Sequence, residues 1–115
     1  MPKTLVFLKT DEDFSEFKKS RGLVSPNFRL RWRYSQNQNH PRFGFIVPKK
    51  VMKNVTDRNL VKRRVKSILS KHLAQIYPVD ILFFPKPGSI KVSFKDLEQE
   101  VLENFRKAKI IKENA

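Results

Sequence analysis

The order of hydrophobic patterns along the chain predicts an α+β fold in which helices cover one sheet. Residues 28–34 alternate apolar side chains with arginine, residues 57–76 place apolar side chains at helical spacing, and residues 79–84 form an apolar run of strand length. A chain of 115 residues with 39% hydrophobic residues and ten Phe has material for one core. We therefore expect residues 1–115 to form a single domain.

A short helix is predicted near the start of the chain. Residues 11–19 begin with acids and end with lysines, the order that a helix dipole favours, and Gly22 follows as a stop. Phe14 and Phe17 fall on one face of this helix. They either pack into the core or contribute to a binding surface.

Residues 28–34 predict a strand with two different faces. One face would bury Phe28, Leu30, Trp32 and Tyr34, and the other would present Arg29, Arg31 and Arg33. The arginines either keep an exposed sheet face soluble or contact phosphates and stack on bases. A polar, turn-like segment and a second strand at residues 43–47 follow, which predicts a hairpin that ends at Pro48, at or near a sheet edge.

A long helix is predicted from a cap at Thr56 or Asp57 to about Ile76. At about 100° per residue, one stripe of it is apolar; the stripe contains Val61, Val65, Ile68, Leu69, Leu73 and Ile76. One flank carries Asn59, Lys62, Arg63 and Lys66, whereas Arg64 and Lys71 lie on the opposite flank. Arg58 projects in line with the stripe but sits in the first turn, where it can extend past the core.

A largely buried strand at residues 79–84 and a final amphipathic helix complete the order of elements. The apolar positions of this helix are Phe94, Leu97, Val101, Leu102 and Phe105. We expect residues 107–115 to form a frayed tail.

The charge of the chain indicates a polyanionic partner. The net charge is +14 and the pI is about 10.4, and Asp57 is the only acid between Phe17 and Val79. The basic flank of the long helix is either a solvated face or an RNA-binding surface, and the lack of balancing acids favours the second. The absence of Cys and of an apolar run of about 20 residues predicts a cytoplasmic protein without a membrane partner.

No constellation in the sequence predicts a protein-based catalytic centre. His40 lies beside Pro41 in a turn, and His72 falls on the apolar side of the long helix, without the partners of a general base. The acids Asp11, Glu12 and Asp13 are explained by the preference of helix starts for negative charge. We expect no catalytic residue, metal site or tightly bound cofactor in the protein.

The chain resembles the protein component of bacterial ribonuclease P from about Phe14 to Phe105. The strand ending in Lys49 and Lys50 is followed by Arg58-Asn59-Leu60-Val61-Lys62-Arg63-Arg64, which is similar to the family's Arg-Asn-Arg motif continued by Lys-Arg. Leu60 stands where the second arginine of that motif is expected, so its contact is lost or moved to Arg64 or Lys66. Phe14 and Phe17 are three residues apart where the family often has four.

The resemblance implies an αβββαβα sandwich with a central sheet, an extra short strand at residues 23–25 and a left-handed βαβ crossover. It implies an accessory subunit of an RNA-based endoribonuclease, in which a catalytic RNA with Mg²⁺ removes the 5′ leader of precursor tRNA, with one protein per RNA. The RNA-binding residues would be Arg58, Asn59, Lys62, Arg63, Lys66, Lys49 and Lys50. The leader cleft would contain Phe14, Phe17, Arg29, Arg31 and Arg33.

An RNA-recognition-motif domain that binds single-stranded RNA without a role in cleavage is the alternative. Residues 42–47 resemble its aromatic strand signature, and residues 5–8 supply a possible partner strand. The glycine expected directly after Arg42 is absent. This alternative would use Phe43 and Phe45 for base stacking and leaves the basic helix unexplained.

Overall fold

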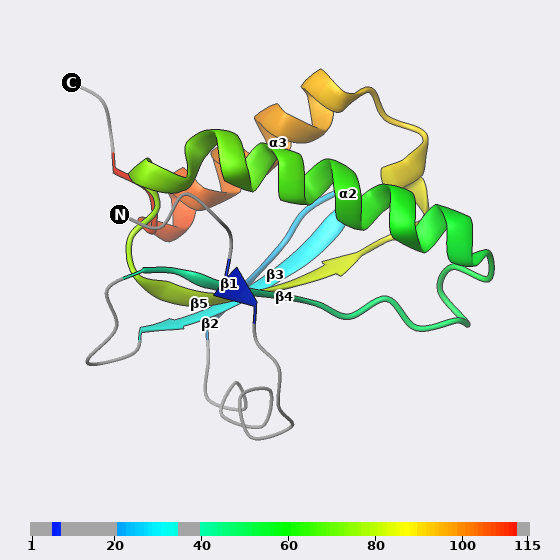
Figure 1. Cartoon of the computed structure of the whole chain (residues 1–115), viewed down its shortest axis with the longest axis horizontal. Coiled ribbons are helices and arrows are strands. Elements are labelled where there is room, and N and C mark those ends of the chain that lie inside the picture. Colours follow the sequence, from blue (N-terminus) through cyan, green and yellow to red (C-terminus); the bar gives the residue numbers. More distant parts are fainter. Residues whose placement is uncertain (1–5, 8–20, 35–39, 113–115) are drawn as a thin grey trace.

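The computed structural model describes residues 6–7, 21–34 and 40–112. In these residues, helices lie over one face of a mixed sheet (Figure 1). The predicted first helix at residues 11–19, with Phe14 and Phe17, falls outside the described residues.

The sheet confirms the α+β class. Its strands are β1 (Val6–Phe7), β2 (Arg21–Val24), β3 (Phe28–Tyr34), β4 (Arg42–Phe45) and β5 (Val79–Pro85), in the order β1-β4-β5-β3-β2. β3 is antiparallel to β2 and β5, whereas β4 is parallel to β1 and β5. β2 is the extra strand that the family resemblance implies, although it begins two residues earlier than residue 23.

The predicted hairpin between β3 and β4 is wrong, because β5 lies between them. Every residue of β5 except Phe84 is buried. A run that is apolar on both faces is typical of a strand in the middle of a sheet. Neighbouring strands there pair along both of its edges, and their side chains help to cover its two faces. The hairpin partner of β3 is instead β2, with Leu23 opposite Leu30.

The alternation of β3 is confirmed at all but its last position. Phe28, Leu30 and Trp32 are buried on the face toward the helices. Tyr34, predicted to be buried, is 63% exposed. Tyr34 is the last residue of β3 and pairs with Val79, the first residue of β5. The alternation of apolar residues therefore extends to the end of the sheet, where fewer neighbouring side chains cover Tyr34.

The long helix α2 (Val55–His72) connects the parallel strands β4 and β5 and is followed by the 3₁₀ helix η2 (Leu73–Gln75). The cap is Asn54 and not Thr56 or Asp57. The carbonyl oxygen of Asn54 accepts bonds from the backbone N–H groups of Asp57 and Arg58, both at 3.1 Å. The helix therefore begins earlier than predicted, and η2 replaces its predicted last turn.

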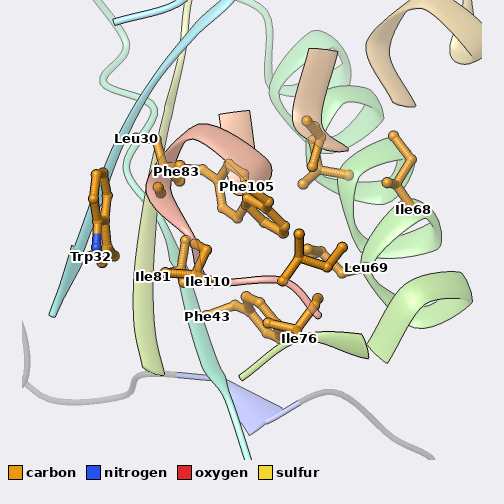
Figure 2. Close-up of a cluster of buried hydrophobic side chains, with 14 of the residues drawn as sticks. Leu30, Trp32, Phe43, Ile68, Leu69, Ile76, Ile81, Phe83, Phe105 and Ile110 are labelled. Carbon is orange, nitrogen blue, oxygen red and sulfur yellow. The ribbon is translucent and has the colours of Figure 1, made fainter. Parts of the chain in front are cut away.

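The core lies between the sheet and the helices, as Figure 2 shows for the side chains around Phe83 and Phe105. Five of the six residues predicted for the apolar stripe are buried: Val61, Val65, Ile68, Leu69 and Ile76. Leu73 is partly buried and packs against them. From the sheet, Phe43, Ile81 and Phe83 are each 1% exposed or less. The core fixes which faces of α2 and β3 remain outside it.

The chain ends in a 3₁₀ helix, η3 (Pro87–Ile90), and the helix α3 (Phe94–Ala108). Lys109 ends α3 in the left-handed conformation at φ 59°. The prediction of a frayed tail is wrong for residues 107–112, because Ile110 and Ile111 are 0% and 6% exposed and Ile111 bridges to Ile76. These apolar residues gain more by covering the core than they lose in freedom.

Candidate nucleic-acid interface

The outward flank of α2 is basic in the structure, as its spacing predicts. This α2 flank consists of Asn59, Lys62, Arg63 and Lys66; Lys62 is half-buried and the other three are exposed. Val61 and Val65, which alternate with these residues in the sequence, belong to the buried stripe of α2. The apolar stripe therefore fixes the rotation of the helix and presents the flank to solvent.

The opposite flank of α2 contacts α3 and the segment before it. Arg64 donates from Nη1 to the carbonyl oxygen of Val92 at 3.1 Å. Lys71 Nζ and His72 Nε2 lie 3.2 and 3.1 Å from Glu98 Oε2. The hydrogen bond from His72, with support from Lys71, lowers the pKa of Glu98 below its usual 4.5. His72 thus has the carboxylate partner that its sequence context did not reveal, and that partner joins two helices.

A turn at residues 48–53 precedes α2 and carries further cations. The backbone N–H groups of Val51 and Met52 both donate to the carbonyl oxygen of Pro48, at 3.0 and 3.1 Å. Lys49 and Lys50 lie within this turn and are exposed. Because the turn leads into α2, these two lysines lie in the segment next to the N-terminal end of that helix.

Arg58 lies between this turn and the core. Its Nη1 donates to the carbonyl oxygens of Met52 at 2.8 Å and Lys53 at 3.2 Å. The side chain is half-buried. Arg58 therefore extends past the edge of the core, as predicted, and its guanidinium binds the backbone of the turn.

Arginines occupy the sheet face that points away from α2 and α3. Arg29, Arg31 and Arg33 alternate with the buried residues of β3, so they lie on this arginine face. The guanidinium of Arg29 stacks over the ring of Phe84 at 4.9 Å. In register, Arg29 is opposite Phe84, Arg31 opposite Leu82 and Arg33 opposite Asp80. The three arginines thus form a row beside two apolar residues and one acid of β5.

Asp80 organises one end of the arginine face, and its role was missed from the sequence. Its side chain is 0% exposed and lies between two arginines from neighbouring strands. Arg42 donates from Nε and Nη2 to its two oxygens at 2.8 and 2.7 Å, and Arg33 Nη2 lies 2.9 Å from Oδ2. The signal was a lone acid inside an apolar run of a very basic chain, and only the register of β3, β4 and β5 identifies its partners.

An open hollow lies beside the arginine face at the edge of the sheet. It has a volume of about 280 Å³ and is lined by Gly22, Leu23, Val24, Arg29, Leu30 and Arg31. A side chain at position 22 would narrow it, because a Cβ there would lie 3.3 Å from the carbonyl oxygen of Leu30 and 3.6 Å from Cγ of Arg31. Gly22 thus leaves space in a hollow whose lining includes Arg29 and Arg31.

The predicted RNA-binding residues form two separate surfaces. The α2 flank belongs to the helical layer, and the turn at residues 48–53 leads into the start of α2. The alternation of β3 puts Arg29, Arg31 and Arg33 on the sheet face opposite the helices. Phe14 and Phe17, predicted for the leader cleft, are outside the described residues. A bound RNA would have to reach around the sheet to contact both surfaces.

The part of the chain that the structure describes contains no group of three or more His, Cys, Asp or Glu side chains arranged to hold a metal ion. Neither α2 nor α3 combines the length and the apolar character that a membrane-crossing helix requires.

Comparison with known proteins decides the family. A family model for ribonuclease P matches residues 1–109. The chain belongs to the ribonuclease P protein family. Ribonuclease P protein components with similar sequences include that of Latilactobacillus sakei, 32% identical over 94% of this chain and 91% of the relative, and that of Synechocystis, 30% identical over 96% and 90%.

Solved ribonuclease P proteins share the fold. The Staphylococcus aureus protein superposes with a TM-score of 0.84 at 21% identity, covering 95% of this chain and all of that one. The Thermotoga maritima protein gives 0.77 at 24% identity, covering 87% of this chain and 94% of the other. The RNA-recognition-motif alternative is not supported: Phe43 is 0% exposed, and Phe45 stacks on Phe83 with ring centroids 5.5 Å apart.

Proposed function

We propose that this ribonuclease P protein is the RNA-binding accessory subunit of an RNA-based endoribonuclease that removes the 5′ leader of precursor tRNA. The catalytic RNA supplies the chemistry and binds the Mg²⁺ ions, and the protein binds no cofactor tightly. The protein acts in the cytoplasm, with one copy per RNA. Membership of the family over residues 1–109 supports this role.

The α2 flank is the surface proposed to bind the catalytic RNA. The observation that carries this proposal is the exposure of Asn59, Arg63 and Lys66 on one flank of the buried stripe of α2, with Lys49 and Lys50 exposed just before the helix. Asp57 is the only acid between Phe17 and Val79, so few acids oppose these cations. Closely spaced cations in a stretch with few acids attract the crowded phosphates of folded RNA.

The arginine face is the surface proposed to hold the single-stranded leader. Arg29 and Arg31 border an open hollow at the sheet edge, and the Arg29 guanidinium already stacks on an aromatic ring. Guanidinium groups bind phosphates and also stack on unpaired bases, so the contact tolerates any leader sequence. Phe14 and Phe17, for which the sequence predicts a helix, are proposed to complete this cleft.

Cleavage of precursor tRNA at low Mg²⁺ tests the function. The cognate catalytic RNA is assayed at physiological Mg²⁺ and salt, with and without the protein. We expect the protein to increase the cleavage rate, and a rate that does not change with the protein would refute the assignment. Counterion release predicts that log affinity for the RNA falls with log salt by about 0.7 to 0.9 per neutralised phosphate.

Charge-matched variants test which surface binds the catalytic RNA. Lys62→Ala with Arg63→Ala removes two cations from the α2 flank, and Lys95→Ala with Arg106→Ala removes two exposed cations from α3. We expect the first pair to reduce the salt slope by about 1.4 to 1.8, the value for two phosphates, while the second pair leaves it near wild type. Equal effects of the two pairs would mean that only net charge matters.

Leader binding is tested separately with two substrates. Arg29→Ala with Arg31→Ala should weaken holoenzyme binding of precursor tRNA carrying a leader and leave binding of mature tRNA unchanged. Arg106→Ala serves as the control. Equal loss for both RNAs would place these arginines outside the leader site.

A further inference from the structure

Arg58 opens the motif that resembles the family's Arg-Asn-Arg sequence, yet its contacts in the structure are to protein. Its Nη1 lies 2.8 Å from the carbonyl oxygen of Met52 and 3.2 Å from that of Lys53. Asn59 and Arg63, by contrast, are exposed on the α2 flank. Neighbouring residues of one motif therefore face different surroundings.

Besides Arg58, the buried side chain of Met52 attaches the turn at residues 48–53 to the fold, and the turn is closed by its own backbone. The side chain of Met52 is 4% exposed, and two backbone hydrogen bonds to the carbonyl oxygen of Pro48 close the turn. Lys49, Lys50 and Lys53 project from it and are exposed. Their mutual repulsion favours an open turn, so a contact that holds the backbone near α2 opposes that repulsion.

The chemistry of the Arg58 side chain suits this contact. Arginine stays charged and presents several N–H donors in a rigid fork, whereas a lysine ammonium is a mobile point charge on a flexible stem. Hydrogen bonds from a charged donor are stronger than neutral ones. The position of Arg58 in line with the buried stripe directs it toward the turn and not toward solvent.

We propose that Arg58 is a positioning residue that fixes the turn at residues 48–53 against the first turn of α2, so that Lys49 and Lys50 extend the RNA-binding α2 flank. Arg58 acts on RNA through these lysines and not through a phosphate of its own. The effect on RNA rests on the proposed function, whereas the effect on the turn does not.

Limited digestion by trypsin tests the contact without RNA. The protease cuts after Lys49, Lys50 and Lys53 only when the turn opens, so its rate reports local opening. We expect Arg58→Gln to be cut there about tenfold faster than wild type, the change that the loss of a charge-assisted hydrogen bond produces. Arg63→Ala, which removes the same charge five residues further along α2, should be cut at the wild-type rate.

Arg58→Lys keeps the positive charge, and it tests the proposal if the Arg58→Gln protein does not fold. We expect faster cleavage of the turn in this variant as well, because the ammonium cannot reproduce the fork. Wild-type cleavage in a folded Arg58→Gln protein, or in Arg58→Lys, would overturn the proposal.

Binding to the catalytic RNA tests the consequence for function. Arg58→Gln is combined with Lys49→Ala and Lys50→Ala in a double-mutant cycle. A positioning role predicts that Arg58→Gln adds little once both lysines are absent, and that Arg58→Lys does not restore wild-type affinity. Additive effects with full rescue by lysine would show a direct phosphate contact. If wild type binds no RNA while the turn still opens in Arg58→Gln, the proposed function fails and the positioning of the turn stands.

Discussion

Replacing Asp80 by Asn should destabilise the protein more than any other single change of charge described above. The side chain is 0% exposed and accepts three hydrogen bonds or ion-pair contacts of 2.7 to 2.9 Å from Arg33 and Arg42. Asparagine keeps the shape, removes the negative charge and directs an NH₂ group at guanidinium donors. Two cations then remain at the sheet without their shared counter-ion.

The magnitude follows from the exposure of the partners. Removing one member of a buried ion pair costs about 3 to 5 kcal/mol. The side chains of Arg33 and Arg42 are 21% and 27% exposed, so water partly solvates them after the change. We therefore expect a loss of about 3 kcal/mol, or about 1.5 M in the urea midpoint for an m-value of about 2 kcal/mol/M.

Equilibrium urea unfolding measures this change, with Glu103→Gln as the control. Glu103 pairs with Lys107 at 3.6 Å, and both side chains are more than 60% exposed. An exposed pair of this spacing contributes about 0.3 to 0.5 kcal/mol, so the control should shift the midpoint by about 0.2 M. A midpoint for Asp80→Asn as close to wild type as that of the control would refute the ionic account of this cluster.

Three further changes test other parts of the fold. Glu98→Gln should lower stability above about pH 4.5, because the pKa of Glu98 is lowered from 4.5 in the folded state. This stabilisation is lost as pH falls through the folded pKa. The urea midpoint of the variant should therefore change less than that of wild type over that acidic range. Ser93→Ala removes the side-chain oxygen that accepts from Asp96 N at 3.1 Å and should cost about 1 kcal/mol in thermal unfolding, whereas Ser67→Ala on exposed α2 surface should cost little. Phe83→Ala should cost about 3 to 5 kcal/mol, because Phe83 is 1% exposed and contacts the rings of Phe28, Phe45 and Phe105; a loss under 1 kcal/mol would contradict this packing.

The elements that could be predicted from sequence are those whose pattern is local. The alternation of β3 and the spacing of Val61, Val65 and Leu69 in α2 each depend on residues within one segment, and both are confirmed. The rotation of α2 predicted the exposure of Arg63 because the buried stripe and the flank belong to the same helix. The roles of these residues in RNA binding stay predictions.

The elements that could not be predicted depend on distant partners. Strand pairing places β5 between β3 and β4, and nothing in residues 28–47 specifies that insertion. The ion pairs of Asp80 follow from the same register, which places Arg33 opposite Asp80 and commits its guanidinium to a contact within the protein. Ile110 and Ile111 contradict the predicted frayed tail, and two adjacent apolar residues after a helix end are a signal of burial.

The central position of β5 also determines when the protein can fold on the ribosome. β2 and β3 form one half of the sheet, β1 and β4 form the other, and the two halves meet only through β5. Pairing of β5 closes a long connection that includes α2, which makes it a slow, non-local step. We therefore expect the two half-sheets of a nascent chain to stay apart until residue 85 has left the exit tunnel, with strand edges of a basic chain open until then.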